Sequence, residues 1–256
     1  MQEYQISFNG NRIDAAEGVD LHYYDFNNLP DRQINIHKLA RRSLSIITSS
    51  EYSQKTVPIF LDVCGGNRQE TEALIKNLKS LIQAQNGLLK VLQGGIEVQY
   101  TATMNEFNIE WLGTRAVVTI VFLASTPIGE SVDTVVLLTA NSITTSSYNQ
   151  SFTIQGSFPA EPLITVIINS VTGGTAATIN LFNAVSNQGI SITGNFTAGS
   201  ILEVDSQNMT VTLNGGNLDF EGLFPTFAPG TQQLAYTDTF TTRNISLSGT
   251  YRQRLI

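Results

Sequence analysis

The stretch from Gly199 to Leu234 constrains the fold more than any other part of the chain. Apolar and polar residues alternate from 201 to 206, which is the side-chain period of a strand. Turn-forming residues follow at 206–208 and again at 214–217. The segment 223–230 is rich in aromatic residues and proline, and is too irregular for a plain ladder strand. The stretch therefore predicts a turn-dense antiparallel sheet that ends in an irregular corner.

The rest of the second half repeats this pattern. Short strand-like segments are separated by Gly- and Asn-rich turns such as Gly173-Gly174 and Asn187-Gln188-Gly189, and none has helical periodicity. Strands at spacings of about 8 to 12 residues are typical of a β-sandwich. We expect a sandwich domain over residues 131–240, with a further strand over 241–256 that is long enough to return to the first domain.

The first half contains one segment with a helical period. Asn67 and Glu70 have the spacing of a capping box, and an apolar stripe with a 3.6-residue period follows. Gly87 stands where a left-handed cap would end the helix, so we predict a helix over about 68–85. Strand patterns surround it, including 115–123, which is apolar enough to be buried on both faces. We therefore expect an antiparallel barrel-like or sandwich-like domain with one helix over residues 1–130, and a mostly-β fold class.

Charge and hydropathy exclude several classes of partner. The net charge is −7 and only 14% of the residues are charged, which argues against specific nucleic-acid binding. Arg41-Arg42, with Lys38 nearby, is the only adjacent basic pair and is better explained as a solvated strand end. No apolar run approaches the roughly 18 residues of a membrane span, and Met1 to Gly10 does not resemble a signal peptide. We expect synthesis in the cytoplasm.

The candidate catalytic residues do not form a recognisable set. His22 and His37, the only histidines, lie on predicted strands, and the sequence has no Gly-x-Ser-x-Gly nucleophile elbow. Cys64, the only cysteine, ends an apolar strand and is expected to be buried as a small hydrophobic residue. We therefore predict that the chain is not an enzyme and has no catalytic residues.

Carboxylates and aromatic rings offer two further kinds of site. Asp205, Asp219 and Glu221 are candidates for a carboxylate pair or a calcium site, but Asp205 precedes a turn and is expected to bond backbone amides. We predict no metal or cofactor. A sugar could stack on one of four rings, although each is better explained as a core residue. These rings are Trp111, Phe224, Phe227 and Tyr236.

Several segments, in order, resemble the distal tail protein family of siphophages. The first is the helix from Glu70 to Gln85, followed by residues 88–92. The second is the strand 113–123 with Ser125-Thr126-Pro127, similar to the strand that closes the family's N-terminal domain. The third is Gly156 with residues 162–166, which looks like the start of the family's galectin-like C-terminal domain.

The stretch from Gly199 to Leu234 is the fourth matching segment. Its Gly-x-x-Leu-x-Val-Asp, Val-Thr-Leu-Asn-Gly and Phe-Pro-x-Phe-x-Pro-Gly patterns are similar to the family's signature. Phe227 stands where the family prefers leucine, and Gln232 departs from its asparagine. The resemblance covers most of the chain, and the joint order of the motifs is its specific part.

The resemblance implies a structural virion protein at the tip of the tail. It implies a homo-hexameric ring that joins the tail tube protein to the tail-tip hub protein of the baseplate, and that surrounds the DNA path without binding DNA specifically. The alternative is a carbohydrate-binding β-sandwich module used in host-surface adhesion. A tube protein is a weaker third possibility, because it would usually lack the second, galectin-like half.

Overall fold

The computed structural model describes residues 5–24, 32–38, 45–52, 54–93 and 95–255, and it divides the chain into two compact units. The first unit is Met1–Val132 and the second is Asp133–Leu255. Strand β10, Gly129–Ile143, begins in the first unit and continues into the second. Each unit has its own antiparallel pairing, and each is described by itself below.

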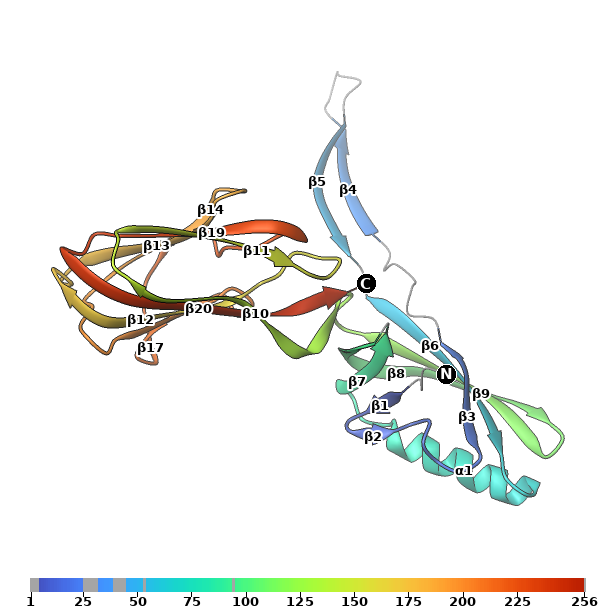
Figure 1. The fold of residues 1–256 in the computed structure, drawn as a ribbon. Coiled ribbons are helices and arrows are strands. Elements are labelled where there is room, and N and C mark those ends of the chain that lie inside the picture. Colours follow the sequence, from blue (N-terminus) through green and yellow to red (C-terminus); the bar gives the residue numbers. More distant parts are fainter. Residues whose placement is uncertain (1–4, 25–31, 39–44, 53, 94, 256) are drawn as a thin grey trace. The chain divides into compact units, whose positions relative to one another are not determined.

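The first unit is built on a curved antiparallel sheet (Figure 1). Its pairing order is β3-β6-β9-β8-β7-β1-β2, and the start of β10 also pairs with β8. β4 and β5 form a separate two-stranded ladder. The strands are β1 Ile6–Phe8, β2 Asn11–Arg12, β3 Val19–Tyr24, β4 Arg32–Lys38, β5 Ser45–Tyr52, β6 Lys55–Cys64, β7 Gly87–Gln93, β8 Ile96–Leu112 and β9 Arg115–Ala124.

Strand β8 is longer than its sequence indicates. The sequence predicts one strand at 96–103 and a second at 107–111, whereas the structure has a single strand over Ile96–Leu112. Its register against β9 shifts between Met104 and Glu106, so one extra residue is accommodated as a bulge. The bulge changes which side chains face inward without ending the strand, and this is why the alternation looks interrupted in the sequence.

The helix α1 spans Arg68–Leu81 and packs against β6 and β9 (Figure 1). The expected cap is present: the Glu70 backbone N–H donates to Asn67 Oδ1 at 3.0 Å, and the Glu70 carboxylate accepts from the Gly66 N–H at 2.7 Å. The predicted end near residue 85 is wrong, because the helix ends at Leu81. Gly87 is not its cap but the first residue of β7, where a Cβ would lie 2.2 Å from the Phe8 ring.

Replacing Asn67 with alanine is expected to destabilise the first unit by about 1 kcal/mol. The substitution removes the acceptor of the Glu70 N–H at the exposed helix end. Urea unfolding followed by tryptophan fluorescence measures this effect, since Trp111, the only tryptophan, lies in this unit. Lys76→Ala, on the exposed face of the same helix, is the control and should change the free energy of unfolding by less than about 0.5 kcal/mol. Equal effects of the two variants would contradict the capping role.

One face of the first sheet forms the core of this unit. Along β6 and β9 the buried residues alternate with half-exposed ones, and Val57, Ile59, Val118 and Ile120 are all fully buried. The expectation that 115–123 is buried on both faces is therefore wrong. The helix α1 covers only one side of the sheet, so the residues of 115–123 that face the other side are only partly buried.

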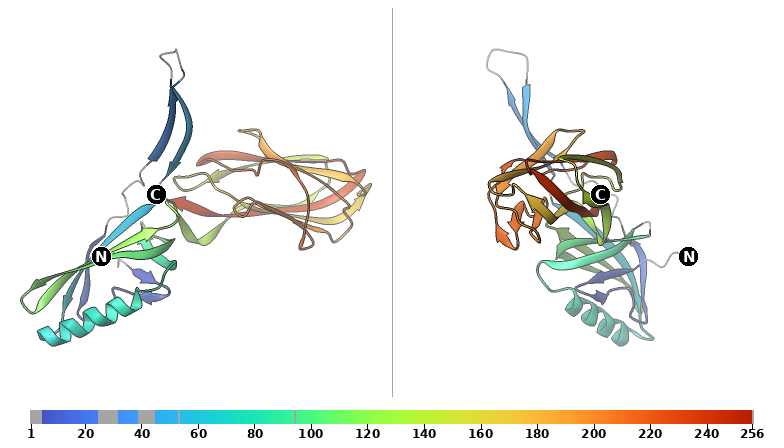
Figure 2. Two further views of the ribbon diagram at one scale, coloured as in Figure 1. Left: turned by 180° about the vertical axis from the view of Figure 1, so that it is seen from behind. Right: turned by 60° about the vertical axis from the view of Figure 1, so that its left-hand side comes forward.

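The second unit is a sandwich of two antiparallel sheets (Figure 2). One layer has the order β17-β16-β15-β12-β20-β10, and the other β11-β19-β13-β14-β18. This confirms the mostly-β fold class with one helix and a C-terminal sandwich. The strands after β10 are β11 Ser147–Ile154, β12 Leu163–Thr172, β13 Ala177–Asn183, β14 Gln188–Gly194, β15 Ile201–Asp205, β16 Thr210–Leu213, β17 Gly216–Asn217, β18 Glu221–Gly222, β19 Gly230–Asp238 and β20 Thr242–Leu255.

The stretch from Gly199 to Leu234 spans both layers of this sandwich. The even-numbered side chains of β15 face inward, and Leu202 and Val204 are fully buried. Asn214 and Gly215 both have positive φ, as a tight hairpin turn requires. The aromatic segment forms only an isolated bridge between Phe227 and Ala160, so the expectation of an irregular corner is met.

The last strand, β20, belongs to the second unit. It pairs with β12 along that strand's whole length, from Leu163↔Thr250 to Thr172↔Thr242. It also pairs with β10, so it is an interior strand of its layer. The sequence left open a return of 241–256 to the first domain, whereas the structure places 242–255 inside the sandwich.

Candidate functional site

The outward face of the five-stranded sheet in the second unit has an open hollow of about 530 Å³. Strands β13, β14, β18 and β19 all contribute to it. Its lining residues are Asn180, Phe182, Asn187, Gly189, Ile190, Ser191, Glu221, Gly222 and Thr237.

Strand alternation explains which side chains face this hollow. Along β13 the odd-numbered residues are buried in the core, so Asn180 and Phe182 point outward. Asn180 lies opposite both Ser191 and Thr237 in the sheet register, and Phe182 lies opposite Gly189. The hairpin between β13 and β14 therefore brings these polar groups and one aromatic ring together.

One glycine keeps the hollow open beside the ring. A Cβ on Gly189, opposite Phe182 in the register, would lie 2.2 Å from the Phe182 Cβ. Gly222 is opposite the inward-facing Ile190 and has a φ of +101°, which side-chain-bearing residues rarely adopt. Strand β14 therefore places no side chain directly opposite Phe182, and Glu221 of β18 lies in the neighbouring row, opposite Ser191.

The polar lining groups are partly pre-oriented. Asn180 Nδ2 donates to Thr237 Oγ1 at 3.0 Å, which fixes the carboxamide and leaves its oxygen directed elsewhere. Glu221 is an exposed residue that pairs through its backbone with Ser191. The result is a shallow site with hydroxyl, carboxamide and carboxylate groups around one ring.

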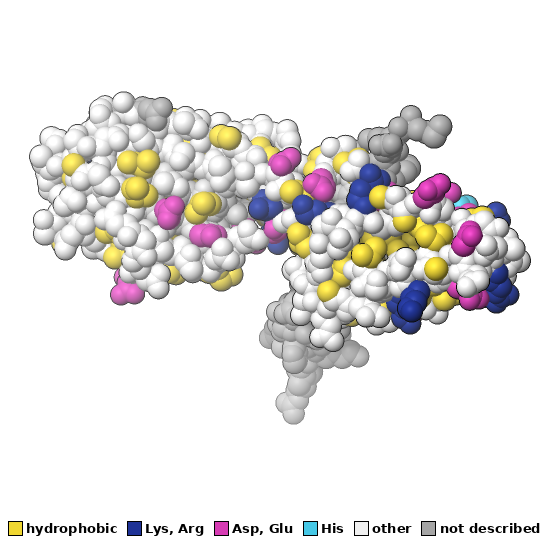
Figure 3. All heavy atoms as spheres, turned by 90° about the horizontal axis from the view of Figure 1, so that it is seen from below, with side chains coloured by type: hydrophobic (Ala, Val, Ile, Leu, Met, Phe, Trp, Pro, Cys, Tyr) yellow, Lys and Arg dark blue, Asp and Glu magenta, His cyan; other side chains and the backbone are white. Residues whose placement is uncertain are grey.

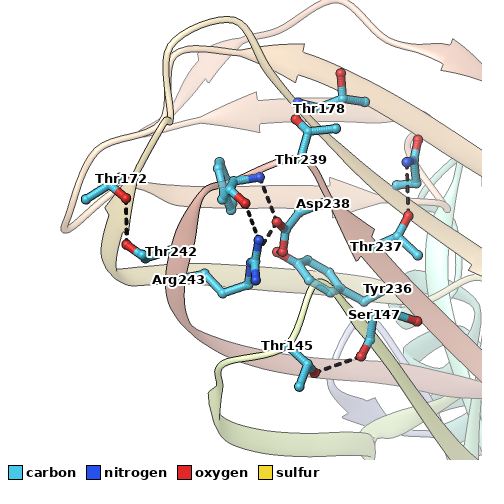
Figure 4. Close-up of polar contacts among 12 residues, drawn as sticks. Thr145, Ser147, Thr172, Thr178, Tyr236, Thr237, Asp238, Thr239, Thr242 and Arg243 are labelled. Carbon is cyan, nitrogen blue, oxygen red and sulfur yellow. Dashed lines mark hydrogen bonds and ion pairs between the residues drawn. The ribbon is translucent and has the colours of Figure 1, made fainter.

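Behind this face, a buried polar cluster ties β19 to β20 (Figure 4). Asp238 Oδ1 accepts from Arg243 Nε and from the Phe240 N–H, each at 2.8 Å, and Asp238 Oδ2 accepts from Tyr236 Oη at 2.8 Å. The Asp238 side chain is fully buried and that of Arg243 is 11% exposed. Burial, together with the hydrogen bond to Asp238, raises the pKa of Tyr236 well above its ordinary range, so its hydroxyl remains a donor. The cluster is structural and does not open into the hollow.

The four rings considered for sugar stacking are not in the hollow. Tyr236 and Phe227 are fully buried, and Phe227 makes an edge contact with Phe152. Phe224 is half-buried against Phe220. Trp111 lies in the first unit, with the Arg68 guanidinium 4.5 Å from its ring centroid. The ring that does line the hollow, Phe182, was missed because its outward orientation follows only from the register of its hairpin.

The candidate carboxylates are not brought together either. Asp205 lies on β15 and accepts from the backbone N–H groups of Gln207 and Asn208 at 3.0 Å, as its position before a turn predicts. Glu221 lies on β18, in the opposite sheet, and Asp219 is exposed before it. Among the described residues no group of three or more His, Cys, Asp or Glu side chains could hold a metal ion.

The remaining candidates are dispersed over the first unit. His22 is exposed, and its Nδ1 is 3.9 Å from Asp62 Oδ2. Cys64 is exposed rather than buried, because it is the last residue of β6 and follows the inward-facing Val63. His37 and Lys38 lie on β4, whose side chains are outside the described part, as is the pair Arg41-Arg42.

The outward face of the first sheet carries several carboxylates together with two cations, Lys90 and Arg115. The register aligns Asp20 with Asp62, Asp62 with Val117, and Val117 with Glu110, so these residues form one row across four strands. Glu106 belongs to the same face, opposite Val121. Within the described residues no helix has the length and hydropathy of a membrane span.

Two comparisons connect this architecture to known proteins. The family model described as "Siphovirus-type tail component, C-terminal domain" matches residues 155–254. The whole chain also has the fold of the crystal structure of the Dit protein (gp 19.1) of phage SPP1. That match has a TM-score of 0.71 and 12% identity, and covers 100% of both chains. The second unit therefore matches the C-terminal domain of siphovirus-type tail components, and the whole chain has the fold of a distal tail protein.

Other structural matches are weaker. Two structures of the phage P2 baseplate in its activated conformation, with Ca and with Sr, match at TM-scores of 0.45 and 0.44. Their identities are 11% and 10%, and both matches cover 98% of this chain and 97% of the other. No curated protein matches the sequence. The matched family is one of structural virion proteins, and is not an enzyme family.

Proposed function

We propose that this chain is a phage distal tail protein that assembles into a homo-hexameric ring and joins the tail tube protein to the tail-tip hub protein. The observation that carries the proposal is the agreement of fold over the full length of SPP1 Dit, which is described as a paradigm of hub adsorption apparatus in Gram-positive infecting phages. Both units are included in that agreement. The presence of the second unit also favours this role over that of a simple tube protein.

The charge of the first unit supports a ring through which DNA passes without adhering. The row of Asp20, Asp62 and Glu110 gives one sheet face a negative charge. A DNA-binding surface would instead need clustered lysine and arginine to neutralise phosphates. The protein is made in the host cytoplasm and then incorporated into the virion.

The dispersal of the reactive side chains supports a role without catalysis. His22 and Cys64 are both exposed, and neither belongs to a nucleophile–base pair among the contacts of the described residues. An activated nucleophile would need a base within hydrogen-bond reach. We therefore assign no catalytic residue to this chain.

The oligomeric state tests the proposal directly. Native mass spectrometry of the purified full chain, alone and with its tail tube and hub proteins, is expected to show a complex containing six copies of the 27.9 kDa chain. Negative-stain images of the same sample should show rings with a central hole. A chain that stays monomeric over the whole concentration range, with and without both partners, would refute the ring.

A further inference from the structure

We propose that the hollow on the outward face of the five-stranded sheet binds a neutral saccharide, with Phe182 as its stacking ring and Glu221 as its main hydrogen-bond acceptor. The lining of this site is complete within a single chain. It is built by β13, β14, β18 and β19 of the second unit alone.

The shape of the hollow suits a flat ligand lying on the sheet. Its volume of about 530 Å³ falls within the usual range for small-ligand sites. It is open on one side, so a polymer could enter it without being threaded. Gly189 leaves one flank of Phe182 uncovered, and a Cβ at that position would lie 2.2 Å from the Phe182 Cβ. The glycine thus leaves the partly exposed Phe182 ring accessible, where a larger residue at 189 would cover it.

The chemistry of the lining matches a sugar. A pyranose presents an apolar C–H face and, around its edge, hydroxyl groups that both donate and accept. Phe182 offers an apolar ring face, and Asn180, Ser191 and Thr237 offer neutral donors and acceptors. The Glu221 carboxylate has two oxygens that accept only, which suits two neighbouring hydroxyl groups.

The charges of the second unit argue against an anionic ligand. No lysine occurs between residues 133 and 255, and the only arginines are Arg243, Arg252 and Arg254. Arg243 is paired with Asp238 and Arg254 with Glu161, and neither lines the hollow. Arg252 lines a different and smaller hollow. Figure 3 draws this unit from the side of the other layer, which also carries few charged side chains. A phosphate-bearing polymer would therefore meet Glu221 without a compensating cation.

The site is held by rigid elements. Asn180 and Phe182 lie on an interior strand of the sheet, paired on both sides by β14 and β19. The hydrogen bond from Asn180 to Thr237 fixes the carboxamide before any ligand arrives. Such pre-orientation reduces the entropy lost on binding.

Saturation-transfer NMR with the full-length chain tests this site. The probes are neutral oligosaccharides that contain glucose, galactose, rhamnose or N-acetylglucosamine, and a glycerol-phosphate polymer as the anionic comparison. At least one neutral probe is expected to bind with a Kd of about 1 mM. Glu221→Gln should weaken that binding about tenfold, because a hydrogen bond to a charged acceptor is lost. Phe182→Ala should weaken it by a similar factor.

A matched pair of serine variants locates the site. Ser191→Ala lies in the hollow and should weaken binding about threefold. Ser151→Ala lies on the same sheet face on β11, outside the hollow, and should leave the affinity unchanged. Thermal unfolding of every variant checks that the fold is intact. If Phe182→Ala does not fold, the exposed variant Glu221→Gln provides the decisive measurement.

Three results would each overturn the proposal. These are no binding of any neutral probe at about 10 mM, binding of the glycerol-phosphate polymer alone, and neutral-probe binding that Glu221→Gln leaves intact. Ring formation is read by mass, in a separate experiment. A failure of the saccharide site is therefore distinguishable from a failure of the assembly role.

Discussion

Replacing Asp238 with alanine is expected to lower the free energy of unfolding of the second unit by about 3–5 kcal/mol. The Asp238 side chain is completely buried and accepts hydrogen bonds from Arg243, Tyr236 and the Phe240 N–H. Its removal leaves the Arg243 cation, which is only 11% exposed, without its carboxylate. An uncompensated buried charge costs far more than the net contribution of the intact pair.

Urea unfolding measures this loss, followed by circular dichroism for the β-sandwich and by tryptophan fluorescence for the first unit. The fluorescence transition should be unchanged, because the only tryptophan, Trp111, lies outside the second unit. Glu161→Ala is the control, since the Glu161–Arg254 ion pair is 30% and 20% exposed and should contribute no more than about 1 kcal/mol. If Asp238→Ala and Glu161→Ala lowered the free energy of unfolding by the same small amount, the buried cluster would not stabilise the sandwich.

Phe227→Ala is expected to destabilise the second unit by a similar amount, about 3–5 kcal/mol. The side chain is fully buried, its ring centroid is 5.1 Å from that of Phe152, and its backbone bridges Ala160 through bonds of 2.8 and 3.0 Å. Truncation creates a cavity at the place where the irregular segment enters the core. The surrounding backbone is tied by the Ala160 bridge, so it collapses only partly into the space.

The neighbouring Leu223→Ala is a matched control from the same segment. Leu223 is 67% exposed, so its truncation should change the free energy of unfolding by less than about 0.5 kcal/mol. The same circular dichroism transition reads both variants. A loss below about 1 kcal/mol for Phe227→Ala would show that this segment is not part of the cooperative core.

Much of the fold follows from local sequence patterns. The side-chain alternation in 201–206 and the Asn214-Gly215 turn predict β15, its turn and β16, because register in a hairpin is set by the turn and by the buried face. The capping box at Asn67 predicts the start of α1 correctly. The end of that helix was predicted too late, because the apolar stripe continues through Ile82, which is buried beyond the last helical turn.

The candidate site could be predicted only in part. Phe182 and Gly189 flank a short turn symmetrically, so their pairing could have been inferred from the hairpin alone. Glu221 could not, because β18 joins β14 only through the tertiary fold. The exposure of Cys64 likewise depends on which face of β6 the helix covers, and a strand's own sequence does not determine that.

The position of β20 has a consequence for biosynthesis. Strand β20 lies between β12 and β10, so one layer of the sandwich is divided in two until residues 242–255 are available. A ribosome makes those residues after every other strand of the sandwich, and the pairing of Leu163 with Thr250 joins distant parts of the domain's sequence. The first unit can therefore fold while the second is still being made, whereas the second unit must wait for β20. A nascent chain that lacks β20 exposes two open sheet edges, on β12 and on β10, where another chain could pair.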